Sequence, residues 1–119
     1  MVLDASAEGT KNGCMITHTM IVSFDQPLPD TDLDQYLNDI EQVMRGTGLV
    51  QSFAARRHLA IPGEEAIAAL IATAVVQVGV ADMDALAKAF AAPDTHEVID
   101  RWQARHPYHV AWANHEPLA

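Results

Sequence analysis

The sequence is poor in cysteine, in basic residues and in long apolar segments. Its single cysteine, Cys14, cannot form a disulfide within the chain, so we expect a reducing, cytoplasmic location. Only 7 Lys and Arg accompany 16 Asp and Glu, for a net charge of -9. Because phosphate groups are bound by clustered basic side chains, this balance argues against nucleic acid and against an anionic membrane surface. The longest apolar-rich run, residues 66–80, is too short to cross a membrane.

The sequence motifs that bind cofactors are missing as well. No glycine-rich fingerprint for a dinucleotide or a phosphate is found, and Ser23 lacks the G-x-S-x-G context of a hydrolase nucleophile. His106 and His109 straddle a proline without a cysteine or carboxylate at a recognised ligand spacing. We therefore expect neither a cofactor nor a metal ion.

Composition and size indicate one globular domain. Half of the 119 residues are apolar and 19% are charged, which is ordinary for a folded chain. The first 14 residues are polar and contain glycine, so residues 1–14 are expected to form a flexible N-terminal leader and residues 15–119 the domain.

The hydrophobic pattern predicts four strands and three helices. Residues 16–24 alternate, with His18, Met20, Val22 and Phe24 on one face. A helix capped by Asp30 or Thr31 should end at Gly46 and Gly48, and a strand over 50–59 should lead to a turn at Pro62-Gly63. The valines before residue 80 indicate a third strand. A helix capped by Asp82 should follow, with Met83, Leu86 and Phe90 facing inward. A further helix should start at Pro93-Asp94, and a last strand should lie within 107–118.

This order, β-α-β-β-α(α)-β, is that of a ferredoxin-like α+β fold, a four-stranded antiparallel sheet with helices on one face. The opposite face would carry Thr19, Ile21, Thr73 and Val75 with no helix over it. Because such a face is commonly closed by a second copy of the chain, we expect a homodimer.

Three stretches carry a resemblance to a known family. The segment "THTMIVSF", the valine strand running into "DMDALAKAFAAPDTHEVI" and the closing aromatic strand resemble the stress-responsive A/B barrel family of dimeric α+β barrels. The resemblance implies a small-molecule cavity between the sheet and its helices. Some members are stress proteins and others are tailoring enzymes, among them small polyketide cyclases, which are lyases of biosynthetic pathways.

Two histidines correspond to family positions. His96 is similar to the catalytic histidine on the helix after the short connection, with a one-residue shift in the turn, and His18 matches the first-strand histidine. The family tyrosine falls at or next to Ala89, and a further pocket histidine falls near Ala74, so Tyr36 or Tyr108 would have to supply a hydroxyl. The alternatives are a solvated His96 at a helix start and a hydrogen-bonded core His18.

The remaining candidates are an expected substrate wall and two residues at a strand end. Arg57 could pair with a substrate carboxylate or phosphate and His58 lies beside it, although a solvated strand end that offsets local acidity explains both. The expected wall, which could equally be plain core, consists of Met20, Val22, Phe24, Tyr36, Val76 and Trp102.

These residues predict an enzyme without a cofactor that acts on a small, hydrophobic, oxygenated, polyketide-like molecule. His96 would move a proton next to a carbonyl and His18 would orient or polarise the substrate, giving cyclisation, isomerisation or elimination. The alternatives are a non-catalytic stress-responsive or ligand-binding dimer and a cofactor-free monooxygenase of the same superfamily.

Overall fold

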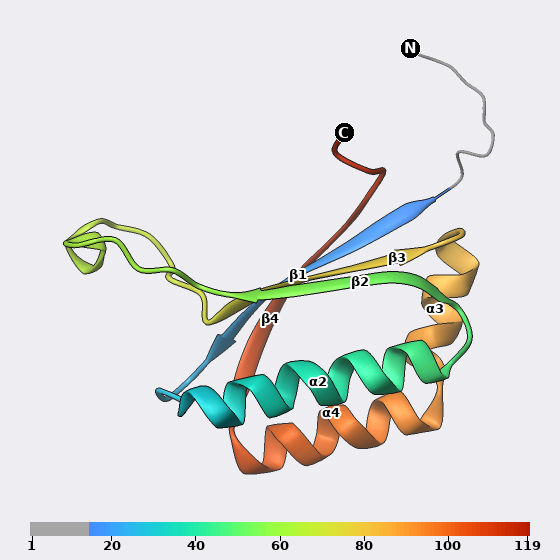
Figure 1. Ribbon diagram of the computed structural model, residues 1–119, viewed down its shortest axis with the longest axis horizontal. Coiled ribbons are helices and arrows are strands. Elements are labelled where there is room, and N and C mark those ends of the chain that lie inside the picture. The colour runs from blue at the N-terminus through green and yellow to red at the C-terminus, as the bar shows by residue number, and fades with distance from the viewer. Residues whose placement is uncertain (1–14) are drawn as a thin grey trace.

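The computed structural model describes residues 15–119, and the predicted leader lies outside them. One four-stranded antiparallel sheet has its helices on one side (Figure 1). None of the helices within 15–119 is long and apolar enough to cross a membrane. In chain order the elements are β1 (Ile16–Phe24), α2 (Asp30–Gly46), β2 (Val50–Arg57), the short 3₁₀ helix η2 (Glu64–Ala66), β3 (Ala74–Val80), α3 (Met83–Ala91), α4 (Pro93–Arg105) and β4 (Tyr108–His115).

The predicted ferredoxin-like architecture is confirmed by the strand order β2-β3-β1-β4. Strand β1 lies between β3 and β4 and is antiparallel to both, with Met20 opposite Val76 on one side and Trp112 on the other. The predicted alternation along β1 is also confirmed, since His18, Met20 and Val22 are buried while Ile21 is 41% exposed.

Helices α2 and α4 lie side by side beneath the sheet and enclose the core with it (Figure 1). The buried residues of α2, which include Tyr36, Ile40 and Met44, recur at helical spacing and form one stripe. Trp102 of α4 is fully buried, and its indole N–H donates to the Asp39 carboxylate at 3.0 Å. This hydrogen bond joins the two helices at the one polar atom that the buried indole carries.

The helix starts agree with the expectation for α3 and α4 and differ from it for α2. Pro29 occupies the N-cap position of α2, so neither Asp30 nor Thr31 caps it, and Pro93 is the first residue of α4 after an Ala92 N-cap. In both cases a proline, whose φ suits a helix start and which has no N–H to satisfy, replaces a side-chain cap. The predicted cap of α3 is confirmed, because the Asp82 carboxylate accepts from the Ala85 N–H at 2.8 Å.

Two smaller expectations were wrong. Met83 at the start of α3 is 50% exposed rather than inward. Strand β2 ends at Arg57, because the chain then leaves the sheet through a long loop, residues 58–73, that turns at Gly63 with φ of 81°. Thr73, the last residue of this loop, directly precedes β3. Its hydroxyl oxygen accepts from the Phe24 N–H at 3.0 Å, which fastens this loop to β1.

The Asp82 cap predicts a measurable loss of stability. Asp82→Ala leaves the Ala85 N–H without its acceptor and should lower the free energy of unfolding by about 1 kcal/mol in urea titrations. Asp84→Ala is the matched control, since Asp84 makes only an exposed pair with Lys88 and should cost well under about 1 kcal/mol. Equal losses in the two variants would contradict the assignment of the cap.

Candidate functional site

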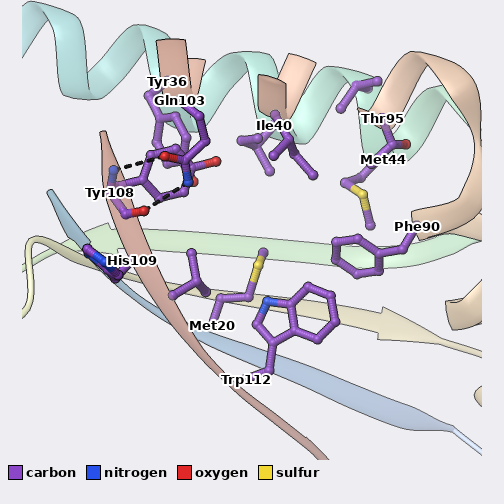
Figure 2. A pocket seen from close by; sticks show the side chains of 13 residues that line it. Met20, Tyr36, Ile40, Met44, Phe90, Thr95, Gln103, Tyr108, His109 and Trp112 are labelled. Carbon is purple, nitrogen blue, oxygen red and sulfur yellow. Dashed lines mark hydrogen bonds between the residues drawn. The ribbon is translucent and has the colours of Figure 1, made fainter. Parts of the chain in front are cut away.

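A cavity of about 350 Å³ lies between the sheet and the helices. Figure 2 shows Met20 and Trp112 rising from the sheet side toward Ile40 and Met44 on the helix side. This volume is at the lower end of the range for small-ligand pockets, roughly 300–1,000 Å³. Among the described residues, no Asp, Glu, Lys or Arg lines the cavity. Its polar lining residues are Tyr36, Thr95, Gln103, Tyr108 and His109, and its apolar ones are Met20, Ile40, Val43, Met44, Phe90, Ile99, Val110 and Trp112.

His18 lies one aromatic ring behind this cavity. Its imidazole is fully buried and packs edge-on against two rings that line the cavity. The ring centroids are 4.9 Å apart for Phe90 and 4.8 Å apart for Trp112. Its Nδ1 lies 2.6 Å from the side-chain oxygen of Asn114, the residue directly opposite on β4. A carbonyl oxygen only accepts, so Nδ1 carries the proton and Nε2 the lone pair.

The Nε2 atom of His18 is buried and has no hydrogen-bond partner among the residues described. Burial lowers the pKa of His18 below its usual value, and the hydrogen bond with Asn114 offsets part of that effect. The imidazole is therefore neutral at neutral pH and offers a free lone pair, which is the state of a general base. A buried polar atom without a partner is uncommon enough to indicate a ligand or a functional role.

His96 does not face the cavity, so the prediction that both imidazoles converge there was wrong. The structure exposes His96 and buries Thr95, which lines the cavity and donates its hydroxyl to the Ala89 carbonyl at 2.9 Å. Successive helical residues are rotated by about 100°, so a one-residue shift turns a side chain from the core to solvent. With Pro93 as the first residue of α4, position 95 is the inward one.

A pair of phenols occupies one end of the cavity. Tyr36 and Tyr108 are almost fully buried, with ring centroids 5.1 Å apart. Burial, followed by the adjacent Tyr108 phenol, raises the pKa of Tyr36 far above its usual range. Burial also raises the pKa of Tyr108, which the Tyr36 hydroxyl partly offsets. Both phenols are therefore neutral hydrogen-bonding groups at physiological pH.

The expected substrate wall is only partly the real one. Met20 and Tyr36 line the cavity, whereas Val22, Val76 and Trp102 are core residues that do not reach it. Phe24 also stays outside the lining and packs behind the phenols, 5.0 Å from Tyr36 and 4.9 Å from Tyr108. The side chains nearest the sheet's centre fill space against the helices, and the cavity opens toward β4 instead.

Arg57 and His58 lie away from the cavity, so their expected contact with a substrate there was wrong. Arg57 forms ion pairs with Asp30 and Asp34 at the start of α2. The His58 imidazole lies 2.8 Å from the Glu64 carboxylate in the loop after β2. Both side chains hold surface elements in place. Within residues 15–119, no three His, Cys, Asp or Glu side chains gather in an arrangement that could hold a metal ion.

Several lining residues were not recognised from the sequence. Phe90, Thr95, Gln103 and Trp112 were assigned to helices and strands but given no role in the site. Tyr108 was considered only as a possible hydroxyl. The usable signal was the alternation of β4, where Tyr108, Val110 and Trp112 point to the same face.

No protein-family model and no curated protein sequence matches the chain. Solved structures match its fold. A DABB-family protein with a ferredoxin-like fold from Mesorhizobium loti is 16% identical, with a TM-score of 0.68 over 88% of this chain and 98% of that one. A hydroxynitrile lyase from Passiflora edulis is 13% identical, with a TM-score of 0.70 over 88% and 94%. SnoaB, a cofactor-independent oxygenase from Streptomyces nogalater, is 10% identical, with a TM-score of 0.66 over 88% and 94%.

The chain therefore has the ferredoxin-like α+β fold of the dimeric α+β barrel proteins, as its sequence resemblance implied. At these identities the likeness establishes the fold and leaves the activity open.

The lowered pKa of His18 predicts a loss of stability in acid. The unfolded chain binds a proton at this site near the ordinary histidine pKa, and the folded chain binds it only at lower pH. The stabilisation is thus complete above the unfolded pKa and is lost as the pH falls through the window between the two values. His18→Gln should flatten the pH dependence of the unfolding free energy in that window. An unchanged dependence would contradict the buried neutral imidazole.

Proposed function

We propose that this chain is a cofactor-free enzyme that moves a proton on a small, mostly apolar, oxygenated molecule bound between the sheet and the helices. His18 is the acid/base group of this proposal, in place of the exposed His96. Cyclisation, isomerisation and elimination next to a carbonyl all need such a proton transfer. Because a chain with the single cysteine Cys14 cannot form an internal disulfide, we propose that the enzyme acts in the reducing cytoplasm.

The buried Nε2 of His18, which has no hydrogen-bond partner within residues 15–119, is the observation that supports this function most strongly. Its Nδ1–H is held by Asn114, which orients the ring and fixes the tautomer. The apolar surroundings keep the ring neutral and able to accept a proton. Only the Phe90 and Trp112 rings separate it from the cavity, and Trp112 is 58% exposed, so a side-chain rotation at this edge would bring Nε2 to a ligand.

The solved structures with the same fold support chemistry of this kind. One is a hydroxynitrile lyase and another is a cofactor-independent oxygenase, so the fold accommodates a lyase and also accommodates oxygenation without a cofactor. Oxygenation of an electron-rich aromatic also begins with removal of a proton by a base, and His18 would serve that step as well.

The test is exchange of the C1 protons of 2-tetralone, a small benzo-fused cyclic ketone, for deuterium, followed by proton NMR. The wild-type chain should accelerate the exchange, and His18→Gln should lower the acceleration about 100-fold, in line with the loss of a general base. Because neutral His18 is the base, the rate should rise with pH to a plateau, with the midpoint of the rise below the usual histidine pKa.

His96→Gln is the matched control, because it removes an exposed imidazole and should leave the exchange rate unchanged. Circular dichroism of both variants verifies that the fold is kept. Equal rates in wild type and His18→Gln, or an equal loss in His96→Gln, would contradict the assignment.

Binding without catalysis is the competing function, and one observation favours it. The Phe90 and Trp112 rings stand between Nε2 and the cavity, so a ligand could fill the cavity without touching the imidazole. Saturable binding of 2-tetralone without accelerated exchange would favour this function.

We also propose that the open face of the sheet closes a homodimer. Ile21 and Val75 on this face are 41% and 38% exposed, and a depression beside them is lined by Ile21, Leu70, Ile71 and Ala111. The polar side chains between them are already paired, since Thr19 bridges Gln77 and His115. A face that is apolar apart from internally paired groups suits burial against a second copy, and the DABB neighbours are dimeric.

Val75→Glu tests the dimer. The wild-type chain should sediment as a dimer and Val75→Glu as a monomer, because the new carboxylate would be buried without a partner in the interface. Met83→Glu is the control, since Met83 is also an exposed apolar side chain and lies on α3, away from this face. A monomeric wild type, or a dimer that survives Val75→Glu, would contradict the proposed interface.

A further inference from the structure

Tyr36 and Tyr108 form a polar end of the cavity that lies remote from His18. Proton transfer at the imidazole does not explain what these two phenols do. We propose that the Tyr108 hydroxyl, supported by Tyr36, is a subsite that binds a hydroxyl or carbonyl oxygen of the ligand. The ligand would then be an elongated, neutral molecule with one oxygen at the phenols and its reacting carbon toward Phe90 and Trp112. This inference rests on the proposed function for the identity of the cavity as the binding site.

The phenols are held by a cluster of aromatic rings. Tyr36 packs edge-on against Phe24 and Trp102, with ring centroids 5.0 Å and 5.4 Å apart. The ring centroids of Tyr108 and Phe24 are 4.9 Å apart. Trp102 is itself anchored by its hydrogen bond to Asp39. Rings packed in this way have little freedom to rotate, so their hydroxyl groups are positioned before a ligand arrives.

Gln103 holds the backbone at Tyr108. Its side-chain amide donates to the Tyr108 carbonyl at 2.8 Å and its oxygen accepts from the Tyr108 N–H at 3.1 Å (Figure 2). Both backbone groups at the first residue of β4 are thus satisfied by one side chain of α4. Gln103 lines the cavity, but this double contact makes it a positioning residue for Tyr108.

The phenol pair keeps at least one hydroxyl proton for a ligand. Tyr36 and Tyr108 both line the cavity with ring centroids 5.1 Å apart, and a hydrogen bond between two hydroxyls would use only one of their two protons. Tyr108 is followed in β4 by His109 and Val110, which also line the cavity. Among the described residues no Lys or Arg lines the cavity, so the group that the phenol receives is a neutral oxygen rather than a carboxylate.

The two polar ends are too far apart for a single functional group to use both. Tyr108 lies opposite Phe24 in the sheet and Asn114, the partner of His18, lies opposite His18. Six strand residues separate these positions, which is roughly 20 Å at about 3.3 Å per residue. The stretch between them is lined by Met20, Val110 and Trp112, so the middle of the ligand is apolar.

The test compares 2-naphthol with naphthalene, which differ by one hydroxyl, in titrations followed by calorimetry. Tyr108→Phe should weaken 2-naphthol binding about tenfold, as expected for one lost hydrogen bond, and leave naphthalene binding unchanged within about twofold. Tyr36→Phe, which keeps the Tyr108 hydroxyl, should weaken 2-naphthol binding less. Equal weakening of both probes, or no weakening of 2-naphthol, would overturn the subsite.

Two further measurements keep the inference separate from the proposed function and from misfolding. His18→Gln should lose the accelerated exchange of 2-tetralone protons and still bind 2-naphthol as the wild-type chain does, so a failure of the proposed function is distinguishable from a failure of the subsite. In the wild-type chain labelled with ¹³C at tyrosine Cζ, the Tyr108 resonance should shift with 2-naphthol and not with naphthalene. The same shift with both probes would overturn the inference without any variant.

Discussion

The register of β1 between its two neighbours is the constraint on which the candidate site depends. It places Asn114 opposite His18, Trp112 opposite Met20 and Tyr108 opposite Phe24. His18, its partner Asn114, and the cavity-lining Trp112 and Tyr108 all come from these cross-strand pairs. A slip of one residue would turn each inward side chain of β1 to the open face and remove both ends of the cavity at once.

The same register explains why His18 can be buried. An imidazole in an apolar layer needs a partner for at least one nitrogen, and Asn114 supplies it at 2.6 Å. The Nε2 of His18 has no hydrogen-bond partner among the described residues, which lowers the stability of the folded state. The apolar packing of Met20, Val22 and the helices offsets this loss. A protein that retains such a cost at the edge of a cavity is consistent with use of that nitrogen.

Much of the fold could be predicted because alternation and helical spacing are local properties of the sequence. The faces of β1, the buried stripe of α2 and the Asp82 cap follow from residues within a few positions of one another. The error at His96 is of the same local kind. The Pro93 start was recognised, but the phase of α4 relative to the core was taken one residue late, and Thr95 is the inward side chain.

The rest of the site could not be predicted, because it depends on contacts between distant segments. Asn114 is 96 residues from His18, and nothing in either neighbourhood indicates the pairing. Gln103 and Tyr108 are near in sequence, but their hydrogen bonds position a cavity residue only because α4 and β4 both pack next to α2. Val22, Val76 and Trp102 were expected to form the wall because sequence pattern identifies buried residues without distinguishing a filled core from a cavity lining.

A crystal structure with 4-(4-hydroxyphenyl)butan-2-one, which carries a phenol and a ketone at opposite ends, tests the central claim most directly. The account predicts this molecule between sheet and helices, with its phenol oxygen hydrogen-bonded to the Tyr108 hydroxyl and its ketone against the Phe90 and Trp112 rings. A molecule bound on the open face of the sheet, or in the cavity with no contact to either Tyr108 or those rings, would contradict it.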